Sequence, residues 1–89
     1  MEFEWDEAKR ATNLRKHGVD FASIADLDWA HIRESEDRRK DYGECRWVAF
    51  GRIGDRVHVL IYTPRGHRIR VISLRRANDE ETDAYEREA

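Results

Sequence analysis

Apolar side chains are concentrated in the second half of the chain, in short runs separated by turn residues. The runs from Arg46 to Ile53 and from Arg56 to Thr63 are rich in β-branched and aromatic residues, which favours strands. Gly54-Asp55 lies between them and is typical of a two-residue hairpin turn. The pattern therefore predicts an antiparallel hairpin.

Two further strands are predicted on either side of this hairpin. A loop at residues 64–67 leads into a strand from Arg68 to Arg75, and residues 30–35 form a short edge strand. The charged run from Glu34 to Glu44 ends in turn residues and is expected to be an exposed loop.

Helix signals occupy the rest of the chain. Asp6 can cap a helix over residues 7–17, with Gly18 in the left-handed position that follows it. Asp20 can cap a second, short helix to about residue 29, and Asn78 with Glu81 resembles a capping box for a last helix. The order α-α-β-β-β-β-α predicts an α+β fold with an antiparallel sheet of about four strands. Without repeats or linkers, residues 1–89 are expected to form one domain.

The two turns define a strand register. In this register Phe50 opposes Val59, Thr63 opposes Arg68 and Ile61 opposes Arg70. One face is then a core surface for helices, with Arg75 emerging on it; its apolar residues are Trp47, Ala49, Leu60, Tyr62, Ile69 and Val71. The other face is apolar at one end (Phe50, Val57, Val59, Ile72, Leu74), and its other end collects Arg46, Thr63, Arg68 and Arg70 beside Arg65 and His67.

The positive charge of the chain is local. The net charge is -2, yet the segment from Pro64 to Ala77 holds five arginines, one histidine and no acid. Guanidinium groups match phosphate through two parallel hydrogen bonds, so this segment predicts a polyanion site, with nucleic acid as the first candidate. The acidic balance of the whole chain argues against a general DNA-coating protein.

Other features limit the cell compartment and the chemistry. Cys45 is the one cysteine, which excludes an intramolecular disulfide and fits a reducing cytoplasm. The acidic start predicts no signal peptide, and the longest apolar run, from Val59 to Tyr62, is too short for a membrane span. No zinc-type spacing and no glycine-rich phosphate loop is present, so we expect neither a metal nor a cofactor.

Short motifs follow one another in a specific order along most of the chain: Phe3-Glu4-Trp5-Asp6 with Lys9, Asn13-Leu14-Arg15-Lys16-His17-Gly18-Val19 with Phe21, Asp41-Tyr42-Gly43-Glu44 with Arg46, Gly51-Arg52, Ile61-Tyr62-Thr63, Arg65-Gly66, Arg68-Ile69-Arg70-Val71-Ile72-Ser73, Arg75-Arg76-Ala77 and Tyr85-Glu86. Together they resemble the BrnT family, small bacterial ribonuclease toxins of type II toxin–antitoxin pairs with a RelE-like fold.

The resemblance implies a metal-independent RNA endonuclease that cleaves mRNA and inhibits translation. It also implies a BrnA-like antitoxin with a ribbon-helix-helix DNA-binding domain, and promoter DNA binding through the complex of the two. Two positions depart from the family pattern. Pro64 stands where relatives often have glutamate, and the last helix begins with the acidic run Asn78-Asp79-Glu80-Glu81 where many relatives are basic.

Metal-free RNA cleavage requires a base for the 2′-hydroxyl, an acid for the leaving 5′-oxygen and stabilisation of the charge on phosphorus. The catalytic candidates are Arg65, Arg70, His67, His17 and Glu44, and the candidates for phosphate binding are Arg46, Arg68 and Lys16.

Several of these residues also have a purely structural explanation. Lys16 and His17 fit the last turn of a helix, where cations complement its dipole, and Glu44 fits an ion pair with a nearby arginine. Arg75 and Arg76 are expected to pair with the acidic last helix. One alternative function is a non-catalytic module that docks nucleic acid or an acidic protein. Another is an oligomerisation scaffold in which the arginines form ion pairs with the acidic last helix.

Overall fold

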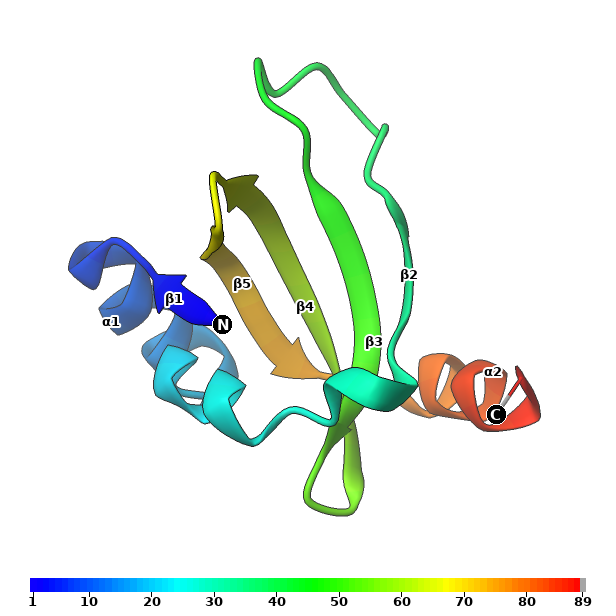
Figure 1. Ribbon diagram of the computed structural model, residues 1–89. Helices are drawn as coiled ribbons and strands as arrows, with labels where there is room; N and C mark the ends of the chain where they lie inside the picture. The colour runs from blue at the N-terminus through cyan, green and yellow to red at the C-terminus, as the bar shows by residue number, and fades with distance from the viewer. Residues whose placement is uncertain (89) are drawn as a thin grey trace.

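A computed structural model describes residues 1–88 and contains a five-stranded sheet of mixed direction with strand order β1-β5-β4-β3-β2 (Figure 1). The predicted α+β class is confirmed, with one strand more than expected. In chain order the elements are β1 (Glu2–Glu4), α1 (Glu7–His17), the 3₁₀ helices η1 (Phe21–Asp26) and η2 (Trp29–His31), β2 (Arg33–Glu36), β3 (Trp47–Ile53), β4 (Arg56–Arg65), β5 (Arg68–Arg76) and α2 (Asp79–Glu88).

The added strand is β1, which pairs in parallel with β5. Glu2 lies opposite Arg68, and Glu4 lies opposite Arg70. A strand of three residues is too short to show a period-two pattern, and its partner lies near the other end of the chain. Local sequence signals therefore could not reveal it.

The helix caps follow the predicted scheme. Asp6 Oδ1 accepts hydrogen bonds from the N–H groups of Ala8 and Lys9, and Gly18 has a φ of 71°. The capping box at α2 is formed in both directions between Asn78 and Glu81. Asp20 caps a second helix as predicted, since its Oδ1 accepts from the Ala22 N–H, but this segment forms two short 3₁₀ helices and not one α-helix.

The register of the first hairpin is confirmed and that of the second is wrong. Phe50 lies opposite Val59 as expected. The second turn contains only two residues, Gly66 and His67, so Thr63 lies opposite Arg70 rather than Arg68. Gly66 has a φ of 60°, a conformation that glycine adopts without strain and that a tight hairpin needs.

A β-bulge in β5 changes the orientation of every residue after it. Tyr62 pairs with Val71, but Ile61 pairs with Ser73, so Ile72 is the extra residue between the two pairs. Leu74 therefore lies in the hydrophobic core, and Arg75 lies opposite Val59. The predictions that Leu74 lies on the arginine-bearing face and Arg75 on the core face are both wrong.

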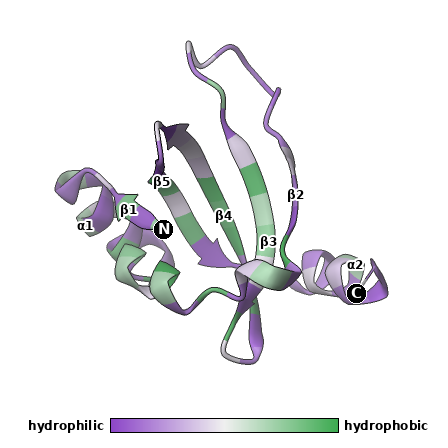
Figure 2. Cartoon of the chain, in the orientation of Figure 1, coloured by the Kyte–Doolittle hydropathy of each residue, from purple (hydrophilic) through white to green (hydrophobic). Residues whose placement is uncertain are grey.

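The hydrophobic core lies between one face of the sheet and the segment that contains η1. Apolar residues follow the middle of β3, β4 and β5 and the turns of η1, whereas α1 and α2 are mainly hydrophilic (Figure 2). All six residues of the predicted core face belong to this cluster or pack against it: Trp47, Ala49, Leu60, Tyr62, Ile69 and Val71. We call this side the core face and the opposite side the arginine face.

Asn13 joins α1 to the edge of β5 beyond the end of β1. Its side chain is buried, and its Nδ2 donates to the carbonyl oxygens of Val19 at 3.0 Å and Leu74 at 2.6 Å. Its Oδ1 accepts from the Leu74 N–H at 3.3 Å. The amide group thus takes the place of a neighbouring strand at this position, satisfying backbone groups that would otherwise lack partners.

No helix within residues 1–88 has the length and apolar composition needed to cross a membrane.

Candidate functional site

The arginine face carries a group of guanidinium side chains at the end of the sheet where β4 turns into β5. Thr63 lies opposite Arg70, and Arg65 lies opposite Arg68. Since side chains two positions apart on a strand share a face, all four side chains lie on the same side. We call Arg46, Arg65, Arg68 and Arg70 the arginine cluster. Its predicted position at this end of the sheet is confirmed.

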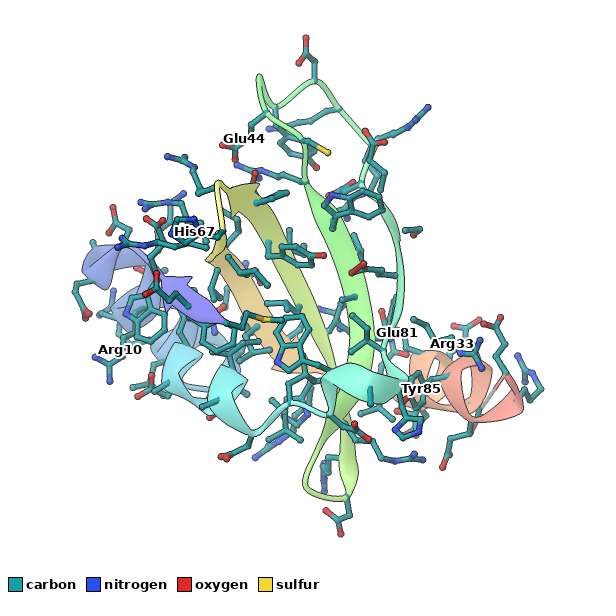
Figure 3. The ribbon with its side chains drawn as sticks, in the orientation of Figure 1. Arg10, Arg33, Glu44, His67, Glu81 and Tyr85 are labelled. Carbon is teal, nitrogen blue, oxygen red and sulfur yellow. The ribbon has the colours of Figure 1, made fainter. Side chains whose placement is uncertain are left out.

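Glu44 connects two members of the arginine cluster. Arg46 Nε lies 3.0 Å from Glu44 Oε2, and Arg65 Nη2 lies 3.4 Å from Oε1. Arg46, through its hydrogen bond, and Arg65, through its charge, lower the pKa of Glu44 below its usual value. Glu44 is therefore an ionised acceptor at neutral pH. Figure 3 shows Glu44 and His67 at this end of the sheet.

The other two arginines pair with β1. Arg68 Nε lies 3.1 Å from Glu2 Oε2, and Arg70 Nη1 lies 2.9 Å from Glu4 Oε2. The partners of the arginine cluster thus come from β1 and from the loop before β3, not from α2 as the scaffold alternative expected. Carboxylate and phosphate bind guanidinium in similar geometry, so these side chains are oriented to accept an anion.

The loop between β2 and β3 positions Glu44 and Arg46. Asp37, whose side chain is 1% exposed, accepts two hydrogen bonds from the Arg39 guanidinium and one from the Tyr42 hydroxyl. Arg39 is the main reason that the pKa of Asp37 lies well below its usual range. The Tyr42 ring in turn lies 4.2 Å from the Arg46 guanidinium carbon. The sequence predicts an exposed loop here and gives no sign of a buried Asp37.

His67 and the histidine at the end of α1 are in different places. His67 is exposed in the turn between β4 and β5. His17 and Lys16 instead line a separate groove of about 470 Å³ between α1 and β5. Burial, followed by the charges of Lys16 and Arg75, lowers the pKa of His17. The structure therefore brings Arg46, Arg65, Arg68, Arg70, His67 and Glu44 to one end of the sheet, and Lys16 and His17 to the side of it.

The end of β5 pairs with the last helix, as predicted for Arg75. Two nitrogens of its guanidinium lie 2.8 and 2.9 Å from the two carboxylate oxygens of Glu81. This pair raises the pKa of Arg75 and lowers that of Glu81. Within residues 1–88, Arg76 forms no ion pair with α2.

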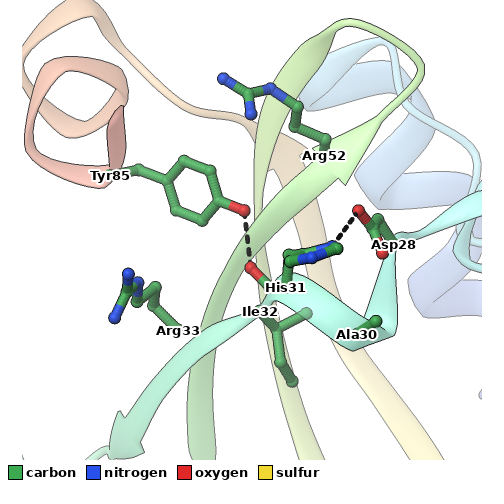
Figure 4. A pocket seen from close by; sticks show the side chains of 7 residues that line it. All are labelled: Asp28, Ala30, His31, Ile32, Arg33, Arg52 and Tyr85. Carbon is green, nitrogen blue, oxygen red and sulfur yellow. Dashed lines mark hydrogen bonds and ion pairs between the residues drawn. The ribbon is translucent and has the colours of Figure 1, made fainter. Parts of the chain in front are cut away.

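A second cavity, of about 530 Å³, lies between η2 and α2 (Figure 4). His31 Nδ1 lies 2.8 Å from Asp28 Oδ2, and the Tyr85 hydroxyl donates to the His31 carbonyl oxygen at 2.6 Å. None of the predicted site residues lines this cavity. His31 is exposed, and His58 is buried.

Fold and site together define a small α+β protein with arginine side chains concentrated at one end of its sheet. Residues 5–81 match the family model described as "Ribonuclease toxin, BrnT, of type II toxin-antitoxin system". The chain belongs to this family of ribonuclease toxins, which confirms the resemblance found in its motifs. A comparison of the sequence with curated proteins found no match.

Proposed function

We propose that this ribonuclease toxin is a metal-independent endonuclease that cleaves mRNA in the cytoplasm and so inhibits translation. The observation that carries the proposal is the arginine cluster, in which four guanidinium groups share one end of one sheet face. The proposal treats residues 1–89 as one toxin domain related to the RelE fold.

Arg65 and Arg70 are proposed to stabilise the charge that develops on phosphorus, while Arg46 and Arg68 hold neighbouring phosphates. The 2′-oxygen attacks phosphorus after losing its proton, and the bond to the 5′-oxygen breaks as that oxygen gains a proton. Glu44 and His67 are the candidate proton-transfer groups at this end of the sheet. Because Glu44 is ionised at neutral pH, it can accept a proton but cannot act first as the acid.

Binding of RNA in this way requires the cluster to exchange its partners. Glu2, Glu4 and Glu44 occupy the guanidinium groups in the free protein, and phosphate groups would replace them. The Arg68–Glu2 pair is exposed, and the Arg65–Glu44 and Arg70–Glu4 pairs are partly exposed. Exposed pairs contribute about 0–1 kcal/mol each, so the exchange is energetically accessible.

The proposed regulator is a BrnA-like antitoxin with a ribbon-helix-helix domain, and promoter DNA would be bound only through the complex of the two proteins. Co-expression with a BrnA-like antitoxin, followed by purification of the toxin, tests this part. Recovery of the toxin alone at full ribonuclease activity would contradict it.

The cleavage test compares the parent with the double variant R65A/R70A on single-stranded RNA in excess chelator. We expect cleavage by the parent and a loss of about 100-fold or more in the variant, in line with removal of transition-state charge stabilisation. R56A/R87A is the matched control, because it also removes two exposed arginines but leaves this end of the sheet unchanged. Loss of parent activity in chelator would refute metal independence.

The ion pairs favour one competing interpretation, in which the arginines act only as a scaffold. R68A and R70A separate the two. If the arginines bind phosphate, each variant loses about 1 kcal/mol of stability or less but loses RNA cleavage. If they are a scaffold, stability falls while the specific activity of the folded protein stays at the parent level. Induction in bacteria gives a further readout, since the parent should arrest growth and R65A/R70A should not.

A further inference from the structure

The groove between α1 and β5 combines polar side chains from both elements. Lys9, Thr12 and Lys16 lie on one side of α1, at helical spacings of three and four residues, and Ser73 faces them from β5. Asn13 holds the two elements together at the base of the groove through its bonds to Leu74. The groove is therefore lined by the lysine and hydroxyl side chains together with the apolar side chains of Ala8 and Ile72.

The lysines of this groove differ from the arginine cluster in having no carboxylate partner. Within residues 1–88, neither Lys9 nor Lys16 forms an ion pair, and both side chains are exposed. Asp6 is the one acid that lines the groove, and its Oδ1 is engaged by the N–H groups at the start of α1. An anion can therefore bind here without displacing an internal partner.

The groove continues the arginine face. Arg70, Ser73 and Arg75 lie opposite Thr63, Ile61 and Val59, which alternate along β4 and so share one face. The bulge at Ile72 makes this possible, because residues five apart on a regular strand point to opposite faces. From Arg70 to Arg75 the strand extends over about 16 Å. After burial, the positive charges of Lys16 and Arg75 both contribute to lowering the pKa of His17, so the groove lies within the electrostatic influence of the end of β5.

We propose that the groove between α1 and β5 is a second subsite for the phosphodiester backbone of single-stranded RNA. The RNA strand runs along β5 from the arginine cluster, and the ammonium groups of Lys9 and Lys16 contact phosphates beyond the cleavage position. The Ser73 hydroxyl is placed to donate to a phosphate oxygen or a ribose hydroxyl, whereas the Thr12 hydroxyl already donates to the carbonyl oxygen of Ala8. This inference rests on the proposed RNA cleavage and extends it to the length of substrate that is bound.

The test uses a 2′-O-methyl RNA oligonucleotide of twelve uridines, which cannot be cleaved through its 2′-oxygen. Binding is measured by fluorescence anisotropy between 50 and 200 mM salt for the parent, K9A/K16A, R65A/R70A and the control R56A/R87A. Each lost phosphate contact should reduce the slope of log K against log salt by about 0.7, or about 1.4 for the pair. The affinity ratio of parent to K9A/K16A should then be about sevenfold larger at 50 mM than at 200 mM.

The outcomes separate the groove from the cluster. If K9A/K16A matches R56A/R87A in slope and affinity while R65A/R70A is impaired, the groove proposal fails and the proposed function stands. If the parent does not bind the oligonucleotide, both fail. If K9A/K16A binds RNA like the control but no longer binds the antitoxin, the groove is a protein contact and the RNA proposal is overturned. Circular dichroism of each variant confirms that it is folded.

Discussion

Replacing Asn13 with aspartate should destabilise the protein strongly. The substitution keeps the shape of the side chain but replaces the Nδ2 donor with a carboxylate oxygen. That oxygen would face the carbonyl oxygens of Val19 and Leu74, which now lie 3.0 and 2.6 Å from Nδ2. Asn13 is 6% exposed, so water offers little compensation.

The expected loss is about 3–5 kcal/mol. Two buried carbonyl groups lose a hydrogen bond worth about 1 kcal/mol each, and a buried charge without a cationic partner accounts for the rest. A chain of 89 residues is expected to have a total stability of roughly 4–13 kcal/mol. N13D should therefore shift the urea midpoint by a large fraction of its value, with an unchanged slope.

The assay is urea unfolding at pH 7, repeated at pH 5. The control is A11D, which introduces the same charge at an exposed position of α1 and should lose less than about 1 kcal/mol. Because burial favours the neutral form of the introduced carboxyl, the difference between N13D and A11D should shrink at pH 5. If N13D unfolds within 1 kcal/mol of A11D at pH 7, the role assigned to Asn13 is wrong.

Two further predictions concern the sheet and the last helix. Burial lowers the pKa of His58 below its usual value, so the unfolded chain binds more protons than the folded protein as pH falls. The free energy of unfolding, measured with urea, should therefore decline from about pH 7 to pH 5, and H58Q should flatten this decline. An equally steep decline in H58Q would contradict the role assigned to His58. Y85F removes the 2.6 Å hydrogen bond to His31 and should lose about 1 kcal/mol, with faster tryptic cleavage at Arg87. Equal stability and equal cleavage rates would show that this bond does not anchor α2.

Features that depend on neighbouring residues could be predicted from the sequence. The cap at Asp6, the left-handed Gly18 and the Gly54-Asp55 hairpin each depend on a few adjacent positions, and each is found. The capping box of α2 belongs to the same class. Contacts between residues far apart in the sequence could not be predicted from such local patterns. Glu2 and Glu4 reach the arginine cluster only because β1 pairs with β5, and the hydrogen bonds of Asn13 depend on the same docking of distant segments.

The second hairpin shows why the arginine cluster was predicted correctly from an incorrect register. The error there was two residues, and a shift of two keeps each side chain on its face. Arg68 and Arg70 therefore share a face in either register, and Arg65, expected in the loop, joins them because β4 continues to Arg65. The bulge is a shift of one residue, which exchanges the faces. For this reason the predictions for Leu74 and Arg75 were wrong, although both residues lie only a few positions further along β5.

The extra residue at Ile72 also limits how the length of β5 can change. Deleting Ile72 would restore a regular ladder and leave Arg70 and Leu74 on their present faces, whereas closing the ladder by a deletion elsewhere in β5 would turn the residues between that deletion and Ile72 to the other face. A deletion before Ile72 and a deletion after it would therefore affect different side chains, because the alternation of side chains between the two faces is interrupted at the bulge. In an alignment of relatives, a one-residue gap placed a few positions away from Ile72 would therefore assign arginines to core positions and leucines to the surface.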